Sequence, residues 1–240
     1  MKIFFHICLT GFLLASALSV QAQNWRGQIS GEGPVVEKTL SLDEFNSLGL
    51  AISGTVHLTQ GSRQEVRIKA QQNIIDNIKQ EVRNGKWNIG FEQNVRKHEA
   101  IHIYVTMRDI RQLAVSGSGS IIGEQGIQSK DIDLAVSGSG DIKLDLQAEE
   151  ANLSISGSGN ILLAGKATTT EVTISGSGNV RALDFTTNGC SVSIAGSGNC
   201  EVDVRDDLNV HVSGSGSVLY EGTPSIKSAI AGSGKVRSKS

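Results

Sequence analysis

Hydrophobic and polar residues alternate through most of the second half of the chain. Typical runs are Ile132-Leu134-Val136 and Ile142-Leu144, in which every second residue is apolar. Alternation of this kind is typical of a β-strand that buries one of its two faces. The pattern therefore predicts a series of short strands, each with one inward row of side chains.

A phrase centred on Gly-Ser-Gly separates the two strands of each pair. It recurs every 18 to 21 residues, with its central serines at Ser118, Ser139, Ser158, Ser177, Ser197, Ser215 and Ser233. Self-similarity at so short a period indicates stacked units, because a propeller blade needs about 40 residues. The sequence therefore predicts an all-β fold, a right-handed parallel β-solenoid with coils of about 18–21 residues and an S-G-S-G corner in each coil.

The repeated corner residues are expected to have a structural role. Glycine adopts positive φ without steric cost, and a Cβ at the corner would meet the next coil, which lies about 4.8 Å away. The central serine hydroxyls are expected to form a ladder, and the Asn or Asp that often follows tolerates a left-handed conformation and stacks well. The predicted corner residues are Gly54, Gly117, Ser118, Gly138, Ser139, Gly157, Ser158, Gly176, Ser177, Gly196, Ser197, Gly214, Ser215, Gly232 and Ser233.

The N-terminal part predicts a first coil and a cap. Leu48-Leu50-Ile52 followed by Ser53-Gly54-Thr55 repeats the phrase with a shortened corner. Apolar residues at helical spacing predict a helix over 73–82, ended by Gly85. Such a helix would cover the open end of the solenoid, which otherwise exposes strand edges and core.

The expected organisation is one continuous domain behind an export signal. Residues 1–22 resemble a secretory signal peptide, with Lys2 before an apolar run and a Val-Gln-Ala cleavage site. Residues 23–112 form the cap and first coil, and residues 113–240 form the repeat array. We therefore expect the protein in the periplasm, on the outer-membrane surface or outside the cell, without an integral membrane span.

Charge and cysteine content narrow the range of partners. The formal net charge is −2 and no basic stripe with interleaved aromatic residues occurs, so nucleic acid is not expected as a partner. Lys235, Arg237 and Lys239 place positive charge on the last coil, which discourages edge-to-edge association. Cys190 and Cys200 fall on inward positions at the starts of two different strands, so we predict free thiols.

The sequence contains no cofactor-binding or metal-binding motif with the spacing that such a motif requires. The glycine phrases lack the remaining residues of a P-loop or of a dinucleotide-binding fingerprint. His98 and His102 lie on a predicted strand, where they would be about 13 Å apart, and solvent-facing histidines are expected instead of a metal site. The sequence therefore predicts no catalytic residue, no cofactor and no metal ligand.

One enzymatic alternative remains open. Some β-solenoids cleave polysaccharides with carboxylates and a basic residue on one outer face. Asp184 and Asp203, with Arg205, are placed to lie on neighbouring coils. A polysaccharide lyase or hydrolase is therefore the alternative to a binding protein.

Four stretches together resemble the head GIN domain family of secreted bacterial adhesin-like proteins. They are "SLDEFNSLGLAISGTVHLTQG", "NIIDNIKQEV", "GKWNIGF" and the repeated "VSGSGD/N", and the resemblance extends from about Val35 to Val236. It implies a β-solenoid in a cell-envelope or surface setting, as in Bacteroidetes-like bacteria, and supplies no catalytic residues.

The sequence as a whole predicts a non-enzymatic envelope or surface module. Outward polar residues vary from coil to coil, whereas inward and corner residues keep their type. This favours an adhesin that binds a glycan or an envelope protein weakly and multivalently through a repetitive polar flank. The sequence predicts no particular oligomeric state.

Overall fold

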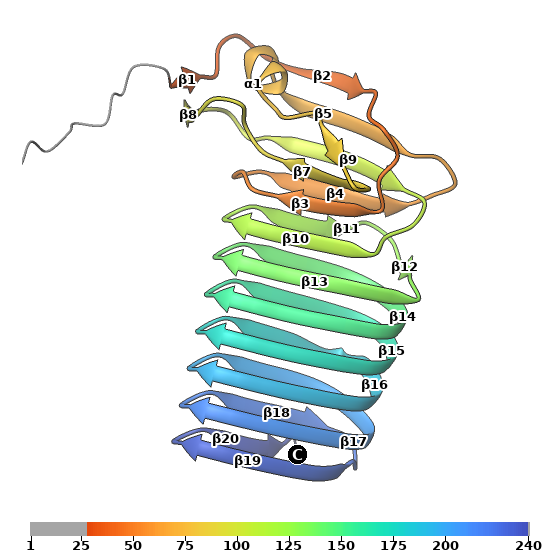
Figure 1. The fold of residues 1–240 in the computed structure, drawn as a ribbon, viewed down its shortest axis with the longest axis vertical. Helices are drawn as coiled ribbons and strands as arrows, with labels where there is room; N and C mark the ends of the chain where they lie inside the picture. Colours follow the sequence, from red (N-terminus) through yellow and green to blue (C-terminus); the bar gives the residue numbers. More distant parts are fainter. Residues whose placement is uncertain (1–27, 240) are drawn as a thin grey trace, which may run out of the picture.

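The computed structural model describes residues 28–239, and parallel strands stack through most of that length. Each strand of the array pairs with the strand one coil away, as Ile142 does with Ile161 and Ile161 with Val180. About seven turns, spaced about 19 residues apart in the sequence, form a single column (Figure 1). The predicted β-solenoid is therefore confirmed.

The strands of the column differ in length. The array consists of β10 (Gln112–Gly117), β11 (Ser120–Gly123), β12 (Ile127–Gln128), β13 (Asp131–Gly138), β14 (Asp141–Gly157), β15 (Asn160–Gly176), β16 (Asn179–Gly196), β17 (Asn199–Gly214), β18 (Ser217–Glu221), β19 (Ser225–Gly232) and β20 (Lys235–Ser238). The preceding part consists of β1 (Ile29–Ser30), β2 (Val35–Leu40), β3 (Ser47–Leu50), β4 (Thr55–Gln60), β5 (Glu65–Gln71), α1 (Gln72–Asp76), β6 (Val82–Arg83), β7 (Lys86–Ile89), β8 (Val95–Lys97) and β9 (His102–Met107).

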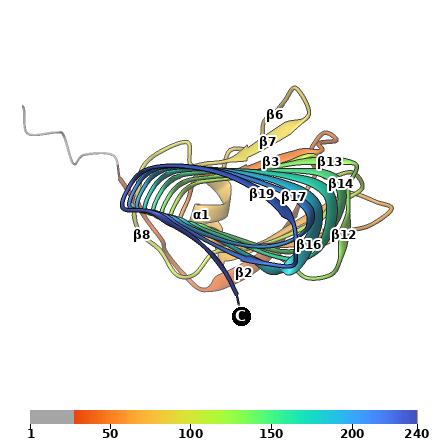
Figure 2. The ribbon, with the colours of Figure 1, turned by 90° about the horizontal axis from the view of Figure 1, so that it is seen from below.

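A coil in cross-section is a flattened loop with two unlike ends (Figure 2). At one end lies the S-G-S-G corner, where the chain turns sharply. At the other end the chain curves widely, and in β14, β15, β16 and β17 it remains strand throughout. We call this second end the open bend, and we call the outer surfaces of the strands before and after the corner the pre-corner face and the post-corner face.

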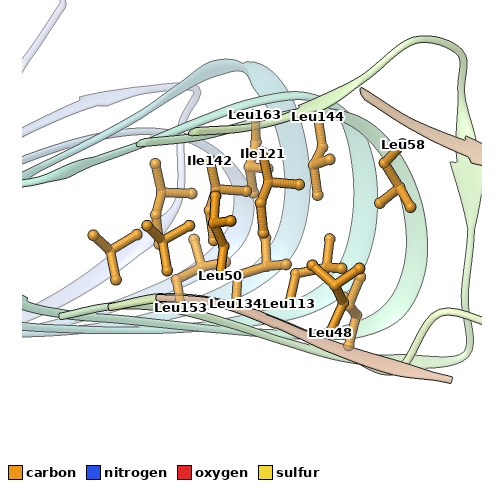
Figure 3. Packing of buried hydrophobic residues seen from close by; sticks show 14 of the residues in the cluster. Leu48, Leu50, Leu58, Leu113, Ile121, Leu134, Ile142, Leu144, Leu153 and Leu163 are labelled. Atoms are coloured by element: carbon orange, nitrogen blue, oxygen red, sulfur yellow. The ribbon is translucent and has the colours of Figure 1, made fainter. Parts of the chain in front are cut away.

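The core fills the space between the two flat sheets. Leu134 and Leu153 point inward from the strands before the corner, and Leu144 and Leu163 point inward from the strands after it (Figure 3). Each of these side chains is buried. Burying a leucine or isoleucine contributes about 1.5–3 kcal/mol, so the predicted period-two pattern is the main source of stability.

The first layers of the solenoid do not follow chain order. β3 and β4 lie directly on β10 and β11, whereas β7 and β9, which come later in the chain, pair with the opposite edges of β3 and β4. Antiparallel β5 then covers the edge of β9, and antiparallel β2 covers the edge of β5. This inserted layer and its antiparallel strands close the N-terminal end.

The predicted helix over 73–82 is wrong in extent. α1 spans only Gln72–Asp76, because Asn77 leaves the helix and exchanges hydrogen bonds with Gln93. The chain then pairs β6 with β7 around Asn84-Gly85, which both have positive φ, as the hairpin signal Asn-Gly requires. The apolar residues that suggested a longer helix, Ile74, Ile75 and Ile78, are nevertheless buried against the end of the core.

The C-terminal end is uncovered within the described residues. Every residue of β19 is exposed, including Ile226 and Ile230 with 38% and 42% of their surface accessible. Lys235 and Arg237 of β20 are exposed as well, in agreement with the predicted charge on the last coil. The two ends of the column are therefore unlike.

The fold does not test the predicted signal peptide or the predicted boundary between cap and array. The predicted signal peptide of residues 1–22 lies outside the described residues. The expected boundary between cap and array, at 112/113, falls within the first residues of β10. Between residues 28 and 239 no helix has the length and apolar character needed to cross a membrane.

Candidate binding surface

The corners combine a special backbone conformation with a close contact between coils. The first glycine of each phrase has positive φ, as in Gly157 with φ of 124°. A Cβ on Gly157 would lie 2.6 Å from the carbonyl oxygen of Gly138, and one on Gly159 would lie 2.3 Å from that of Gly140. Contacts under 3.0 Å are not tolerated, so both glycines are fixed by the neighbouring coil. Gly54 has no positive φ, in keeping with its shortened corner.

Backbone amides, not serine hydroxyls, connect successive corners. The amide of Ser158 donates to the carbonyl of Gly138 over 2.8 Å, and the amide of Ser177 donates to Gly157 over 2.8 Å. The corner serine side chains are exposed and, between residues 28 and 239, their hydroxyls make no hydrogen bond to protein. The expected hydroxyl ladder is thus replaced by a backbone ladder.

A side-chain ladder occurs one residue after the corner glycines. Asn199 donates to the side-chain oxygen of Asn179 over 3.0 Å, Asn179 to Asn160 over 3.0 Å, and Asn160 to the carboxylate of Asp141 over 2.8 Å. None of these residues has positive φ, contrary to the left-handed conformation that the sequence suggested. The expected stacking therefore occurs in ordinary strand geometry.

The pre-corner face presents mostly polar side chains, interspersed with alanines, in aligned columns. Strand register places equivalent residues of successive coils opposite one another, and most of them are exposed. The first column contains Gln112, Asp133, Asn152, Glu171, Ser191, Asn209 and Lys227. The second contains Ala114, Ala135, Ser154, Thr173, Ser193, His211 and Ala229, and the third contains Ser116, Ser137, Ser156, Ser175, Ala195, Ser213 and Ala231. No column contains an aromatic residue larger than histidine.

This face is nearly flat, with shallow hollows between the columns. One hollow of about 330 Å³ is lined by Ser193, Asn209, His211 and Lys227 among others. A second, of about 260 Å³, lies toward the open bend and includes Glu150, Asn152, Glu171 and Asp207. Donors and acceptors therefore face solvent over several coils without a deep cleft.

The post-corner face is chemically diverse. Its central column mixes large charged, aromatic and apolar side chains in no regular order. The column contains Tyr104, His57, Ile122, Lys143, Leu162, Arg181, Glu201, Leu219 and Arg237. The two outer faces of one solenoid thus differ in both size and chemistry of side chains.

Strand register places the two carboxylates of the enzymatic alternative opposite different residues. Asp203 lies opposite Thr186 and accepts a hydrogen bond of 2.6 Å from its hydroxyl. Asp184 lies opposite Ala164 on the other neighbour and falls in a register shift that gives it no partner in β17. Arg205 is exposed. The two carboxylates are therefore not direct strand partners of each other.

The two cysteines are part of the core. Both Cys190 and Cys200 are buried and free. Burial raises the pKa of Cys190 to about 12 and raises that of Cys200 well above its usual value. Because the thiolate is the reactive form, neither residue provides a nucleophile near neutral pH.

The histidines are arranged differently from the sequence-based expectation. His98 contacts the carbonyl of Glu99, whereas His102 meets His57 of the next layer. Sequence spacing could not show this pair, because it depends on the pairing of β4 with β9. Within residues 28–239, no group of three or more His, Cys, Asp or Glu side chains is arranged to hold a metal ion.

Comparison with known proteins agrees with the fold. The family described as "Putative auto-transporter adhesin, head GIN domain" matches residues 44–224. A search of curated proteins gives no match.

Several solved structures share the architecture. A putative adhesin from Bacteroides fragilis has a TM-score of 0.80 at 22% identity, with 88% of this chain and 100% of that chain covered. A putative adhesin from Parabacteroides merdae has a TM-score of 0.73 at 20% identity, with 89% and 100% covered. A putative lipid binding protein from Parabacteroides distasonis has a TM-score of 0.72 at 20% identity, also with 89% and 100% covered. These similarities show the fold alone.

Proposed function

Because the chain belongs to the head GIN domain family, we propose that it is a non-enzymatic module of the cell envelope or surface that binds a glycan or a protein through its pre-corner face. The observation that carries this proposal is the set of three aligned columns, in which most residues are polar and the rest are alanines. The family description as an adhesin and the predicted export signal both support a role outside the cytoplasm.

The spacing of the columns favours an extended polar ligand. Residues of one column repeat about every 4.8 Å, and neighbouring columns are about 6.6 Å apart along a strand. Ser154, Thr173 and Ser193 therefore present hydroxyls at regular intervals on adjacent coils. Each hydrogen bond contributes only about 0.5–1.5 kcal/mol, so useful affinity requires many simultaneous contacts. A polysaccharide chain or an extended protein segment meets that requirement.

The test begins with a glycan array probed with the protein lacking residues 1–22, followed by titration calorimetry on the best ligand. Thr173→Arg and Ser193→Arg place bulky side chains on the pre-corner face and are expected to weaken binding at least tenfold. Asp145→Arg, an exposed position after the corner, is the matched control and should bind normally. Equal loss in the control, or unchanged binding in both test variants, would contradict the assignment of the face.

The proposal also predicts no turnover of polysaccharides. Acidic and neutral polysaccharides should remain intact when incubated with the protein, as measured by reducing ends and by absorbance of unsaturated products. Cleavage that disappears in Asp203→Asn or Asp184→Asn protein would favour the lyase or hydrolase alternative instead.

A further inference from the structure

Three layers bring two histidines and a carboxylate into one chain of contacts at the N-terminal end of the post-corner face. His102 comes from β9, His57 from β4, and Glu124 directly follows β11. Nε2 of His57 lies 3.2 Å from Nδ1 of His102, and Nδ1 of His57 lies 2.6 Å from Oε1 of Glu124. The backbone amide of Glu124 is fixed to the carbonyl of Leu58 over 2.9 Å.

The distance between the two histidine nitrogens suits a shared ion. A tetrahedral zinc ion with Zn–N distances of about 2.0–2.1 Å separates two ligand nitrogens by roughly 3.3 Å. The observed 3.2 Å is close to that value. In the structure this contact is a hydrogen bond, so both rings would have to turn for their lone pairs to converge on one ion.

Glu124 occupies the position of an outer-shell carboxylate. Histidine ligands commonly donate their second ring N–H to a carboxylate, which fixes tautomer and ring orientation. With the proton of His57 on Nδ1 and donated to Glu124, Nε2 has a free lone pair. His102 then needs its proton on Nε2, so that Nδ1 is the second ligand atom.

Neighbouring side chains restrain the pair. The His57 ring stacks on Tyr104 with centroids 4.8 Å apart and planes 16° apart, and the His57 side chain is 22% exposed. The guanidinium group of Arg67 lies over the Tyr104 ring, 5.2 Å from the ring centroid. The charge of Arg67 is already paired with the carboxylates of Glu37 and Glu65. Lys69 is the strand partner of His102 and is the nearby cation that would oppose a bound metal.

We propose that His57 and His102 together bind one divalent transition-metal ion of the zinc class, with Glu124 as outer-shell carboxylate and water completing the coordination. Imidazole nitrogens suit zinc, copper and nickel, whereas calcium and magnesium prefer oxygen ligands. Two protein ligands leave open positions, so the ion could also take a donor from a bound partner. The site is separate from the pre-corner face and does not depend on the proposed glycan or protein binding.

The experiment is calorimetric titration of Zn²⁺ into the protein lacking residues 1–22, purified without a histidine tag, at pH 7.5. One equivalent should bind, and His57→Gln and His102→Gln should each weaken binding at least tenfold. Glu124→Gln should weaken it by about tenfold, as outer-shell changes do. Lys69→Gln should strengthen it. Mg²⁺ should not compete.

His98→Gln and His211→Gln are the matched controls and should retain zinc binding. Urea unfolding of each variant checks that the fold persists. In the wild-type protein, NMR should show the His102 tautomer shifting to Nε2–H when zinc is added. Binding that survives in both His57→Gln and His102→Gln, or the absence of a saturable heat at millimolar zinc, would overturn the proposal.

Discussion

The corner and the open bend both reverse the direction of the chain, but strand register is kept at the corner and changes at the open bend. At the corner, the offset between paired residues is the same on both sides, as Gly157↔Gly176 and Asn160↔Asn179 show. In the open bend the offset changes within one coil: Leu162 pairs with Arg181, 19 positions later, but Ala164 pairs with Asp184, 20 positions later. All variation in coil length is therefore absorbed at the open bend.

This difference shows where a solenoid tolerates irregular strand pairing. Corner glycines touch backbone of the previous coil, so an added atom has no free space. At the open bend the chain curves widely, and the pairing of β16 with β17 shifts between Ala182 and Thr186 and again between Thr187 and Gly189. Regular pairing of core residues resumes after these shifts, as between Val192 and Val210. Repetition of sequence is thus strict only where coils are in closest contact.

The largest effect is expected from Gly157→Val. The new side chain would require a β-branched residue at φ of 124° and would overlap the Gly138 carbonyl. Strain and overpacking together should lower the free energy of unfolding by about 3 kcal/mol or more. Urea unfolding followed by circular dichroism measures this. A wild-type midpoint in the variant would show that the corner is not constrained by its neighbours.

Asn179→Leu should have the next largest effect. Asn179 both donates to Asn160 and accepts from Asn199, so the variant interrupts the ladder at its middle. Loss of these two hydrogen bonds, one partly buried and one exposed, should cost about 2 kcal/mol in the same urea experiment. Asn188→Leu, an exposed position in the open bend, is the control and should change stability much less.

The rates at which the two thiols react allow local opening of the corner to be compared with local opening of the open bend. Cys190 follows Gly189 at the exit of the open bend, whereas Cys200 lies just after a corner and has no exposed surface. If the open bend opens more readily, Cys190 should react with a thiol reagent roughly tenfold faster than Cys200. Single-thiol variants, Cys200→Ala and Cys190→Ala, separate the two rates. Faster reaction of Cys200 would reverse the ranking of the two ends.

The smallest effects are expected from Gly189→Ala and Ser158→Ala. Gly189 has no positive φ, and the nearest atom to an added Cβ is Cγ2 of Thr169 at 4.0 Å, so the alanine should be neutral or stabilise by about 0.5 kcal/mol. The exposed Ser158 hydroxyl makes no bond within the described residues, so its removal should change stability by less than about 0.5 kcal/mol. If Ser158→Ala lowered the free energy of unfolding by more than about 1 kcal/mol, the serine hydroxyl would have to stabilise the corner after all.

Local periodicity was sufficient to predict the array but not its first layers. The alternation at Ile132-Leu134-Val136 and the spacing of the corners determine which residues face inward, and the structure confirms that these residues are buried. The insertion of β7 and β9 beyond β3 and β4 reverses chain order, which no local pattern reports. The shortened α1 has a readable signal, the Asn84-Gly85 hairpin turn, which competes with helical spacing.

The candidate surfaces were predictable to different degrees. The pre-corner columns follow directly from the repeat, because alignment of the corner phrases places Ser154, Thr173 and Ser193 side by side. The contact of His57 with His102 and Glu124 depends on the pairing of three layers separated by up to 67 residues in the chain. Such contacts need the register of the inserted layer and are invisible to spacing along the sequence.

The exposed edge of β19 and the equal offsets on the two sides of each corner have a consequence for how such a protein changes over generations. Duplication of one coil of about 19 residues keeps every corner aligned, because the new coil repeats the same parallel pairing. Each duplication lengthens the column by about 4.8 Å and adds one row to the pre-corner face. Reach and valency can therefore grow in equal steps through gene duplication, while the closed N-terminal end stays as it is.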